Sequence, residues 1–224
     1  MNPDAGETRD NAGDGPDPSA AVISTNRLEA FSDAVFAISI TLLILEIKTP
    51  EPSEHLAADL LGLWPSYIAY LISFLLIGQV WLNHHIMFTF IWRVDRLLLL
   101  FNLLLLLDVA FLPFSTSVLA EAISAGKGEG PAAVFYGGTL AVGGVFFNAI
   151  WIYASTGHRH LNDRITPQHA RAMRRSFALG PVLYLVAAVA GLVSAVASLV
   201  LFGFLLVLYL VEVARLGSTK AGAR

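Results

Sequence analysis

The sequence has little charge and lacks cysteine altogether. Its 224 residues include no Cys, and only 14% are Asp, Glu, Lys or Arg, whereas soluble domains carry about 25%. Without cysteine there is no disulfide framework, thiolate nucleophile or thiolate metal site. A net charge of -3 offers no basic surface for nucleic acid. Because 56% of the residues are hydrophobic, we exclude a soluble enzyme and predict an all-α integral membrane protein.

Residues 1–25 differ in composition from the rest of the chain. They combine several carboxylates, prolines and glycines with a single basic residue, Arg9, and such a composition cannot support a packed core. No apolar run follows a basic start, so this segment is not a signal peptide. We therefore predict a disordered cytoplasmic tail over 1–25, a transmembrane domain over 26–216 and a short cytoplasmic tail over 217–224.

Six apolar segments are long enough to cross a bilayer as helices, which takes about 20 residues each. The predicted spans are Asn26–Ile47, Pro65–Ile91, Arg96–Ala122, Pro131–Ser155, Arg174–Val196 and Leu199–Ala214. An amphipathic stretch, His55–Trp64, precedes the second span at the membrane interface. The last two spans are nearly continuous, and Ser194 and Ser198 mark the expected turn between them.

The distribution of basic residues predicts the orientation of the chain. If the N-terminus is inside, the outside segments contain only Lys48 and Lys127. The inside segments then contain Arg9, Arg27, Arg93, Arg96, Arg159, Arg164, Arg171, Arg174, Arg175, Arg215, Lys220 and Arg224. This asymmetry follows the positive-inside rule, so we expect both termini in the cytoplasm.

Several polar side chains lie at similar depth in different predicted spans. At ~1.5 Å per residue, Asp33, His84 and Asn102 each lie roughly 10 Å from the inner end of their helix. We predict one inner-leaflet cluster of these residues with Asn83, joined by the Trp81 indole. Such polar groups serve as interhelical hydrogen bonds, as proton relays or as ion ligands, and the sequence leaves these alternatives open.

Other polar residues do not assemble into a catalytic or metal site. His84 and His85 are adjacent and point about 100° apart on a helix, so they do not share a face. Neither a His-Glu-x-x-His nor a Gly-x-Ser-x-Gly pattern occurs, so we expect neither an enzyme nor a tightly bound metal. Asp108 lies near the middle of the third span, where a charged group is costly, and the sequence does not identify its donor.

The first span carries a row of residues on one helix face, called here the stripe, and a sequence motif. Ile38, Thr41, Leu42 and Leu45 are spaced so that they share one helix face. The segment Arg27-Leu-Glu-Ala-Phe31-Ser32-Asp33 resembles the Arg-x-x-x-Phe-Ser-Asp signature of the transmembrane-protein-175 family of potassium channels. The resemblance continues through Ala34-Val-Phe-Ala-Ile38, Trp81-Leu-Asn-His84-His85, Asn102-Leu-Leu-Leu-Leu-Leu and Leu112-Pro113-Phe114.

The resemblance implies a fold and a function. A member with one six-helix repeat is expected to form a homotetramer in the plasma membrane, with the first helix of each subunit lining the pore. Ile38 would form the narrow hydrophobic ring, Thr41 a hydroxyl ring, and Leu42 and Leu45 would lie toward the outside. A network would hold the first helix in place: Arg27, Phe31, Ser32, Asp33, Trp81, Asn83, His84 and Asn102.

The expected function is modestly potassium-selective conduction without a Thr-Val-Gly-Tyr-Gly filter. That filter is absent here, and an apolar ring selects less strongly than a filter of backbone carbonyls. No cofactor is expected, and K+ is the permeant ion. The alternative is a proton-coupled secondary transporter that uses Asp33, His84 and Asp108 as relay groups. No inverted repeat supports that alternative.

Overall fold

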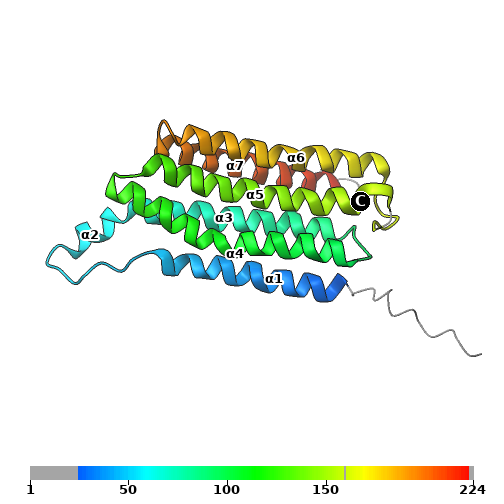
Figure 1. Cartoon of the computed structure of the whole chain (residues 1–224), viewed down its shortest axis with the longest axis horizontal. Coiled ribbons are helices and arrows are strands. Elements are labelled where there is room, and N and C mark those ends of the chain that lie inside the picture. The colour runs from blue at the N-terminus through cyan, green and yellow to red at the C-terminus, as the bar shows by residue number, and fades with distance from the viewer. Residues whose placement is uncertain (1–24, 159, 222–224) are drawn as a thin grey trace, which may run out of the picture.

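The computed structural model describes residues 25–158 and 160–221, and these residues form a helical bundle (Figure 1). The helices are α1 (Thr25–Leu42), α2 (Leu56–Gly62), α3 (Trp64–Phe88), α4 (Arg96–Ala125), α5 (Glu129–Ser155), α6 (Pro167–Ala190) and α7 (Ala195–Ala221). Two 3-10 turns follow α1 and α5, η2 (Leu43–Glu46) and η3 (Thr156–His158). The predicted tail over 1–25 lies almost entirely outside the described residues.

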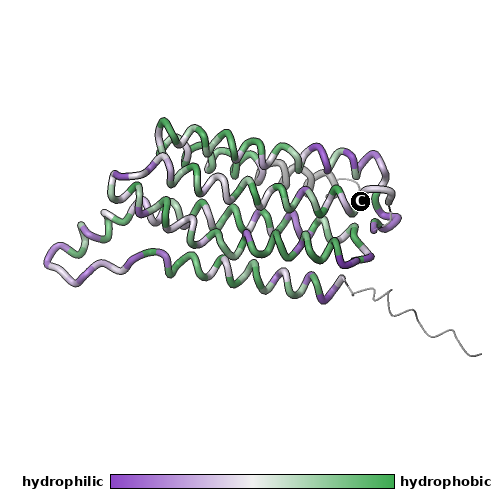
Figure 2. Tube along the Cα trace, in the orientation of Figure 1, coloured by the Kyte–Doolittle hydropathy of each residue, from purple (hydrophilic) through white to green (hydrophobic). Residues whose placement is uncertain are grey.

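Five of these helices are long and apolar enough to cross a membrane: α1 with η2, α3, α4, α5 and α6. The apolar part of α7 among the described residues is shorter, Ala195–Tyr209. Figure 2 shows hydrophobic residues along the helices and hydrophilic residues gathered toward the ends of the bundle and in the connecting segments. The prediction of an all-α membrane protein is therefore confirmed.

Local signals explain where helices begin and end. Asp95 caps α4, since its carboxylate accepts a hydrogen bond from the Leu98 amide at 2.9 Å. Thr166 caps α6 through the His169 amide at 3.3 Å, and Pro167 occupies the first turn. At the other end of α4, Gly126 adopts a left-handed conformation with φ 62°, which glycine tolerates without strain.

α5 packs mainly against α4 and α6, and α3 packs against α1, α4 and α7. α1 lies along one edge of the bundle against α3 and α4, whereas α6 and α7 lie on the opposite side (Figure 1). Tyr136, Trp151 and Phe202 are fully buried in the core. α5 approaches its neighbours closely at Gly137, where an added Cβ would lie 2.8 Å from Phe202 Cζ and 3.0 Å from Ala188 Cα.

A short antiparallel bridge ties two connections together at the end of the bundle where α4 begins. Ile91 pairs with Leu161. The Trp92 amide donates to the His160 carbonyl at 3.0 Å, and the Asn162 amide donates to the Phe90 carbonyl at 2.9 Å. The bridge joins the α3–α4 connection to the segment between η3 and α6.

Several predicted boundaries differ from the structure. α6 begins at Pro167, before the predicted Arg174, because hydropathy locates the apolar part of a helix and not its charged extension. α6 ends at Ala190, before the predicted Val196, and the turn comprises 191–194. Ser198 lies within α7, and its hydroxyl donates to the Ala187 carbonyl at 2.8 Å. α7 continues past the predicted boundary at 216 to Ala221.

Candidate functional site

One face of α1, continued by Leu45 of the 3-10 turn η2, is exposed in the single chain. Ile38, Leu42 and Leu45 are 57%, 41% and 73% exposed, and Thr41 between them is exposed as well. These residues are the stripe predicted from the spacing. Because these side chains are exposed in the single chain, the face is available to lipid or to other subunits.

The Thr41 hydroxyl is oriented by the helix itself. Its Oγ1 donates to the Ile38 carbonyl at 2.8 Å. Because the only hydroxyl proton is used inside the helix, the lone pairs of Oγ1 remain as acceptors on the exposed face. The arrangement presents oxygen, and not a proton, to whatever lies beside α1.

The opposite face of α1, continued by Leu43 of η2, is buried through small polar and large apolar residues. Ser32, Phe36, Ser39 and Leu43 are each no more than 1% exposed. The two serines donate to carbonyls one turn earlier, at 2.8 Å for Ser32 to Leu28 and 2.9 Å for Ser39. The serines therefore bury no unsatisfied hydroxyl and let α1 approach α3 and α4 closely.

A directed hydrogen-bond chain joins α1, α4 and α3. The Asn102 amide donates to Ser32 Oγ at 3.0 Å, and its Oδ1 lies 2.9 Å from His84 Nε2. An amide oxygen only accepts, so Nε2 carries the proton and His84 donates. Phe36 and Phe88 pack against the His84 ring, with centroids 5.5 and 4.4 Å away. All three polar residues of the chain are buried, so it fixes the position of α1.

Trp81 forms the predicted link to Asp33. Its indole Nε1 donates to Asp33 Oδ1 at 2.8 Å, and the pair lies on a more exposed part of the α1–α3 contact. The Trp81 ring also stacks on the His85 ring, with 6.3 Å between the ring centroids. The structure thus separates the predicted cluster into a buried amide–imidazole chain and an exposed indole–carboxylate pair.

The remaining residues of the predicted network lie elsewhere in the single chain. Asn83 lines a cavity with Asp108 on the far side of α3, since it points about 100° away from His84. In the single chain, Asn83 therefore lies apart from the hydrogen-bond chain of His84, and its role in the network stays a prediction. Phe31 is 52% exposed and Arg27 is exposed. Among the described residues, Arg27 takes part in neither of the ion pairs.

A second interhelical polar contact was not predicted. Thr116 Oγ1 donates to the Leu112 carbonyl, so Ser73 Oγ, 2.8 Å away, donates to Thr116. The Tyr136 hydroxyl then donates to Ser73 at 2.9 Å. This chain joins α3, α4 and α5 and is buried. Because tyrosine was counted among the hydrophobic residues, nothing in the sequence suggested a polar role for Tyr136. Only the pairing of Tyr136 with Ser73 would have indicated this contact.

Asp108 faces α5 and not lipid alone. Its carboxylate lies directly against the position where a Cβ would stand at Gly143, so only glycine leaves room for it. Within the part of the chain that the structure describes, no donor forms a hydrogen bond or ion pair with it. Among the described residues, the structure therefore identifies no donor for Asp108.

Outside the membrane-spanning segments, Asp95 has a perturbed pKa. Partial burial alone would raise it, but hydrogen bonds from the Tyr153 hydroxyl at 2.5 Å and the Leu98 amide outweigh that effect. His160 Nε2, 3.5 Å away, adds in the same direction. The net result is a pKa of Asp95 below its usual range, which keeps the cap of α4 ionised.

Comparison with known proteins gives three concordant findings. A family model described as the endosomal/lysosomal potassium channel TMEM175 matches residues 27–113. A potassium channel of Chamaesiphon minutus is 43% identical over 167 residues, which is 73% of this chain and 82% of that protein. A potassium channel of Streptomyces collinus is 42% identical over 188 residues, or 83% of this chain and 91% of that protein.

The fold is also similar to a solved structure. The crystal structure of a lysosomal potassium-selective channel TMEM175 homolog from Chamaesiphon minutus superposes with a TM-score of 0.76 at 38% identity. The similarity covers 84% of this chain and 97% of that one. The matched family segment, 27–113, contains the exposed face of α1 and the buried chain of Ser32, Asn102 and His84.

Proposed function

Because this chain belongs to the TMEM175 family of potassium channels, we propose that it conducts K+ in preference to Na+ through a pore formed by four copies of α1. The sequence supplies six apolar helical segments per chain, and one chain supplies one pore-lining face. We further propose a plasma-membrane location with both termini in the cytoplasm, as the basic residues predict.

The observation that carries the proposal is the two-sided character of α1. One face is buried against α3 and α4 and fixed by the Ser32–Asn102–His84 chain, while Ile38, Thr41, Leu42 and Leu45 are exposed. Because α1 is fixed along its buried face, its exposed face has the same orientation in every subunit. Fourfold repetition of that face would enclose a narrow path.

The chemistry of the proposed path follows from its side chains. A ring of Ile38 offers no ligand, so it excludes water when narrow and closes the path by dewetting. A ring of Thr41 presents acceptor oxygens, because each hydroxyl proton is donated to the Ile38 carbonyl. K+ releases its hydration water more readily than Na+, so this combination favours K+ modestly. No cofactor is needed for passage of the ion.

The alternative, a proton-coupled transporter, is not favoured. Its relay would need Asp33, His84 and Asp108 in one connected path. Asp33 accepts from Trp81, His84 donates to Asn102, and Asp108 borders a separate cavity. In the described part of the chain, no hydrogen bond joins one of the three to another. The relatives from Chamaesiphon minutus and Streptomyces collinus are named as potassium channels, whereas the vertebrate relatives, which match a smaller part of this chain, are named as endosomal/lysosomal proton channels.

The test is the reversal potential of the purified protein in a planar bilayer with K+ on one side and Na+ on the other. We expect single-channel steps and a reversal potential displaced toward the K+ equilibrium value. Ile38→Ser should raise the open probability and lower selectivity. Leu179→Ser on α6, where Leu179 is 59% exposed, is the matched control and should leave both unchanged. Wild-type currents from Ile38→Ser would refute the pore assignment.

A further inference from the structure

One face of α6 is exposed along the length of the helix and carries both apolar and basic side chains. In its apolar part, the side chains that are more than half exposed are Leu179, Val182, Leu185, Val186 and Val189. Toward the start of the helix, three exposed arginines continue the same face, Arg171, Arg174 and Arg175. At 3.6 residues per turn, all eight positions lie within roughly 140° of the helix circumference. We call this surface the α6 outer face.

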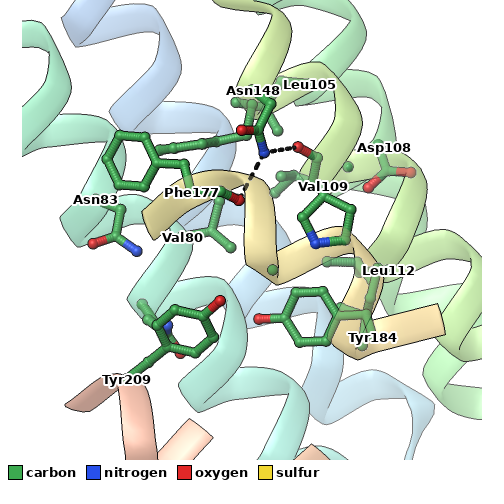
Figure 3. Close-up of a pocket in the computed structure, with 17 residues that line it drawn as sticks. Val80, Asn83, Leu105, Asp108, Val109, Leu112, Asn148, Phe177, Tyr184 and Tyr209 are labelled. Carbon is green, nitrogen blue, oxygen red and sulfur yellow. Dashed lines mark hydrogen bonds between the residues drawn. The ribbon is translucent and has the colours of Figure 1, made fainter. Parts of the chain in front are cut away.

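Two hydrogen bonds from α5 fix the rotation of α6 about its axis. Trp151 Nε1 donates to the Ala170 carbonyl at 3.1 Å, and Asn148 Nδ2 donates to the Phe177 carbonyl at 2.9 Å (Figure 3). The Phe177 ring also packs edge-on against the Trp151 ring, with 6.0 Å between the ring centroids. The three arginines lie in the sequence between these two contacts, so the fold itself determines the direction of that segment.

The α6 outer face is directed toward lipid. α6 and α7 lie on the side of the bundle opposite α1 (Figure 1), so α6 stands at the perimeter of an assembly around α1. α6 is also one of the helices that are long and apolar enough to cross a membrane. Its exposed leucines and valines therefore contact acyl chains, and the arginines on the same face contact whatever lies at the ends of those chains.

The position of the arginines along α6 corresponds to the phosphate level of a bilayer. From Ser176 to Ala190, α6 has no charged side chain, which is a length of roughly 22 Å at ~1.5 Å per residue. The hydrocarbon core of a bilayer is about 30 Å thick. Because the uncharged part of the helix is this short, Arg174 and Arg175 lie at the edge of the hydrocarbon core and not far out in solvent.

The positive charge of this segment is not balanced within the described residues. Neither of the two ion pairs there includes an arginine of α6. Arg171 lies three and four residues before Arg174 and Arg175, and like charges at these spacings on a helix repel one another. A phosphate group accepts several hydrogen bonds from guanidinium groups and offsets their charge. Its chemistry therefore complements that of the arginines.

We propose that the α6 outer face binds an anionic phospholipid of the leaflet in which α6 begins. The guanidinium groups of Arg171, Arg174 and Arg175 bind its phosphate, and its acyl chains lie along Val182 and Val186. Each basic residue beside an anionic membrane surface strengthens binding about fivefold. The site does not depend on the pore. In the proposed orientation of the chain, the leaflet is the cytoplasmic one.

The experiment measures binding of acyl-labelled lipids to the delipidated full-length protein in a non-ionic detergent by fluorescence anisotropy. Phosphatidylglycerol is the anionic probe, and phosphatidylcholine, which carries a phosphate but no net charge, is the reference. We expect saturable binding with a preference for phosphatidylglycerol of more than about tenfold, which decreases as salt is added. The triple variant Arg171→Gln, Arg174→Gln, Arg175→Gln should lose this preference, and Arg175→Gln alone should weaken phosphatidylglycerol binding about fivefold.

A matched triple variant tests whether the effect is local. Arg93→Gln, Arg96→Gln, Arg164→Gln removes three exposed charges from the connecting segments and the start of α4, and it should retain the preference. Equal losses in the two triple variants would overturn the proposal, because the attraction would then be a general one. Equal binding of the two lipids by the wild type would overturn it as well.

Two further outcomes separate other occupants from a lipid. If soluble glycerol phosphate displaces phosphatidylglycerol at equal concentration, the arginines bind free phosphate and the proposal is wrong. If the folded α6 variant elutes from a size-exclusion column as a smaller assembly, the face contacts another subunit and the proposal is wrong. Should the α6 triple variant not fold, Arg175→Gln decides alone. Because lipid binding is the readout, failure of the proposed channel function would leave the result unchanged.

Discussion

Replacing Asn102 with leucine tests whether the buried chain between α1, α3 and α4 stabilises the protein. Asn102 makes two interhelical hydrogen bonds, with His84 at 2.9 Å and Ser32 at 3.0 Å. Interhelical hydrogen bonds in membranes contribute ~0.6 kcal/mol each, so their loss alone costs about 1 kcal/mol. The substitution also leaves the His84 Nε2–H without an acceptor at 1% exposure, and such a group costs about 1–3 kcal/mol.

The expected destabilisation is therefore about 2–4 kcal/mol, which lowers the unfolding midpoint by roughly 4–16 °C. Size-exclusion chromatography of the same samples should show a smaller assembled fraction, since α1 is no longer fixed relative to α3 and α4. Thermal unfolding in detergent, at fixed protein and salt concentration, measures the first effect.

The double variant His84→Phe with Asn102→Leu is the control. Phenylalanine keeps ring contacts with Phe36 and Phe88 and removes the stranded donor, so the double variant should be more stable than the sum of the single effects predicts. Additive effects, or a loss below about 0.5 kcal/mol for Asn102→Leu, would refute the reasoning.

Two further predictions concern packing and pH. Gly137→Ala should destabilise the bundle by about 1–3 kcal/mol, because its Cβ meets Ala188 and Phe202 on the adjoining helices. Gly138→Ala, whose Cβ has nothing within 4 Å, should be neutral. The lowered pKa of Asp95 means that the ionised group stabilises the fold above its unfolded pKa of about 3.9. This contribution is lost as pH falls through the lower folded pKa.

For the two glycine variants, the measurement is the thermal unfolding midpoint. For Asp95→Asn, the same midpoint is measured over a series of pH values and compared with that of the wild type. Asparagine remains a good helix cap, so the variant isolates the charge. Its midpoint should lie below that of the wild type at neutral pH, and the gap should close below about pH 4. Equal effects of the two glycine substitutions, or a gap independent of pH, would contradict these predictions.

The sequence predicts much of this architecture because membrane spans follow directly from composition. Apolar length located the helices, and depth along each helix brought Asp33 to Trp81 and His84 to Asn102. The stripe on α1 followed from the helical period alone. These inferences need only rise and rotation per residue, which every helix shares.

The features that the sequence does not predict depend on how each helix is rotated about its axis. They also depend on contacts with residues far away in the chain. Asn83 has the predicted depth but faces the cavity in the single chain. The surroundings of Asp108 depend on Gly143 in α5, and no local pattern relates the two residues. The start of α6 at Pro167 precedes its apolar part, so hydropathy alone could not find it.

The bridge between Ile91 and Leu161 has a consequence for the order of folding. The contacts that accompany it join residues 67 and 73 positions apart, His160 with Arg93 and Asn162 with Thr89. Closing so long a loop in an unfolded chain is entropically unfavourable. α4 and α5, which lie between these residues, are joined by a short turn and pair as a helical hairpin. Once that hairpin exists, the two connections are already neighbours and the bridge forms at little further entropic cost. The bridge therefore forms late, and its amides should be among the last to gain protection from hydrogen exchange during refolding.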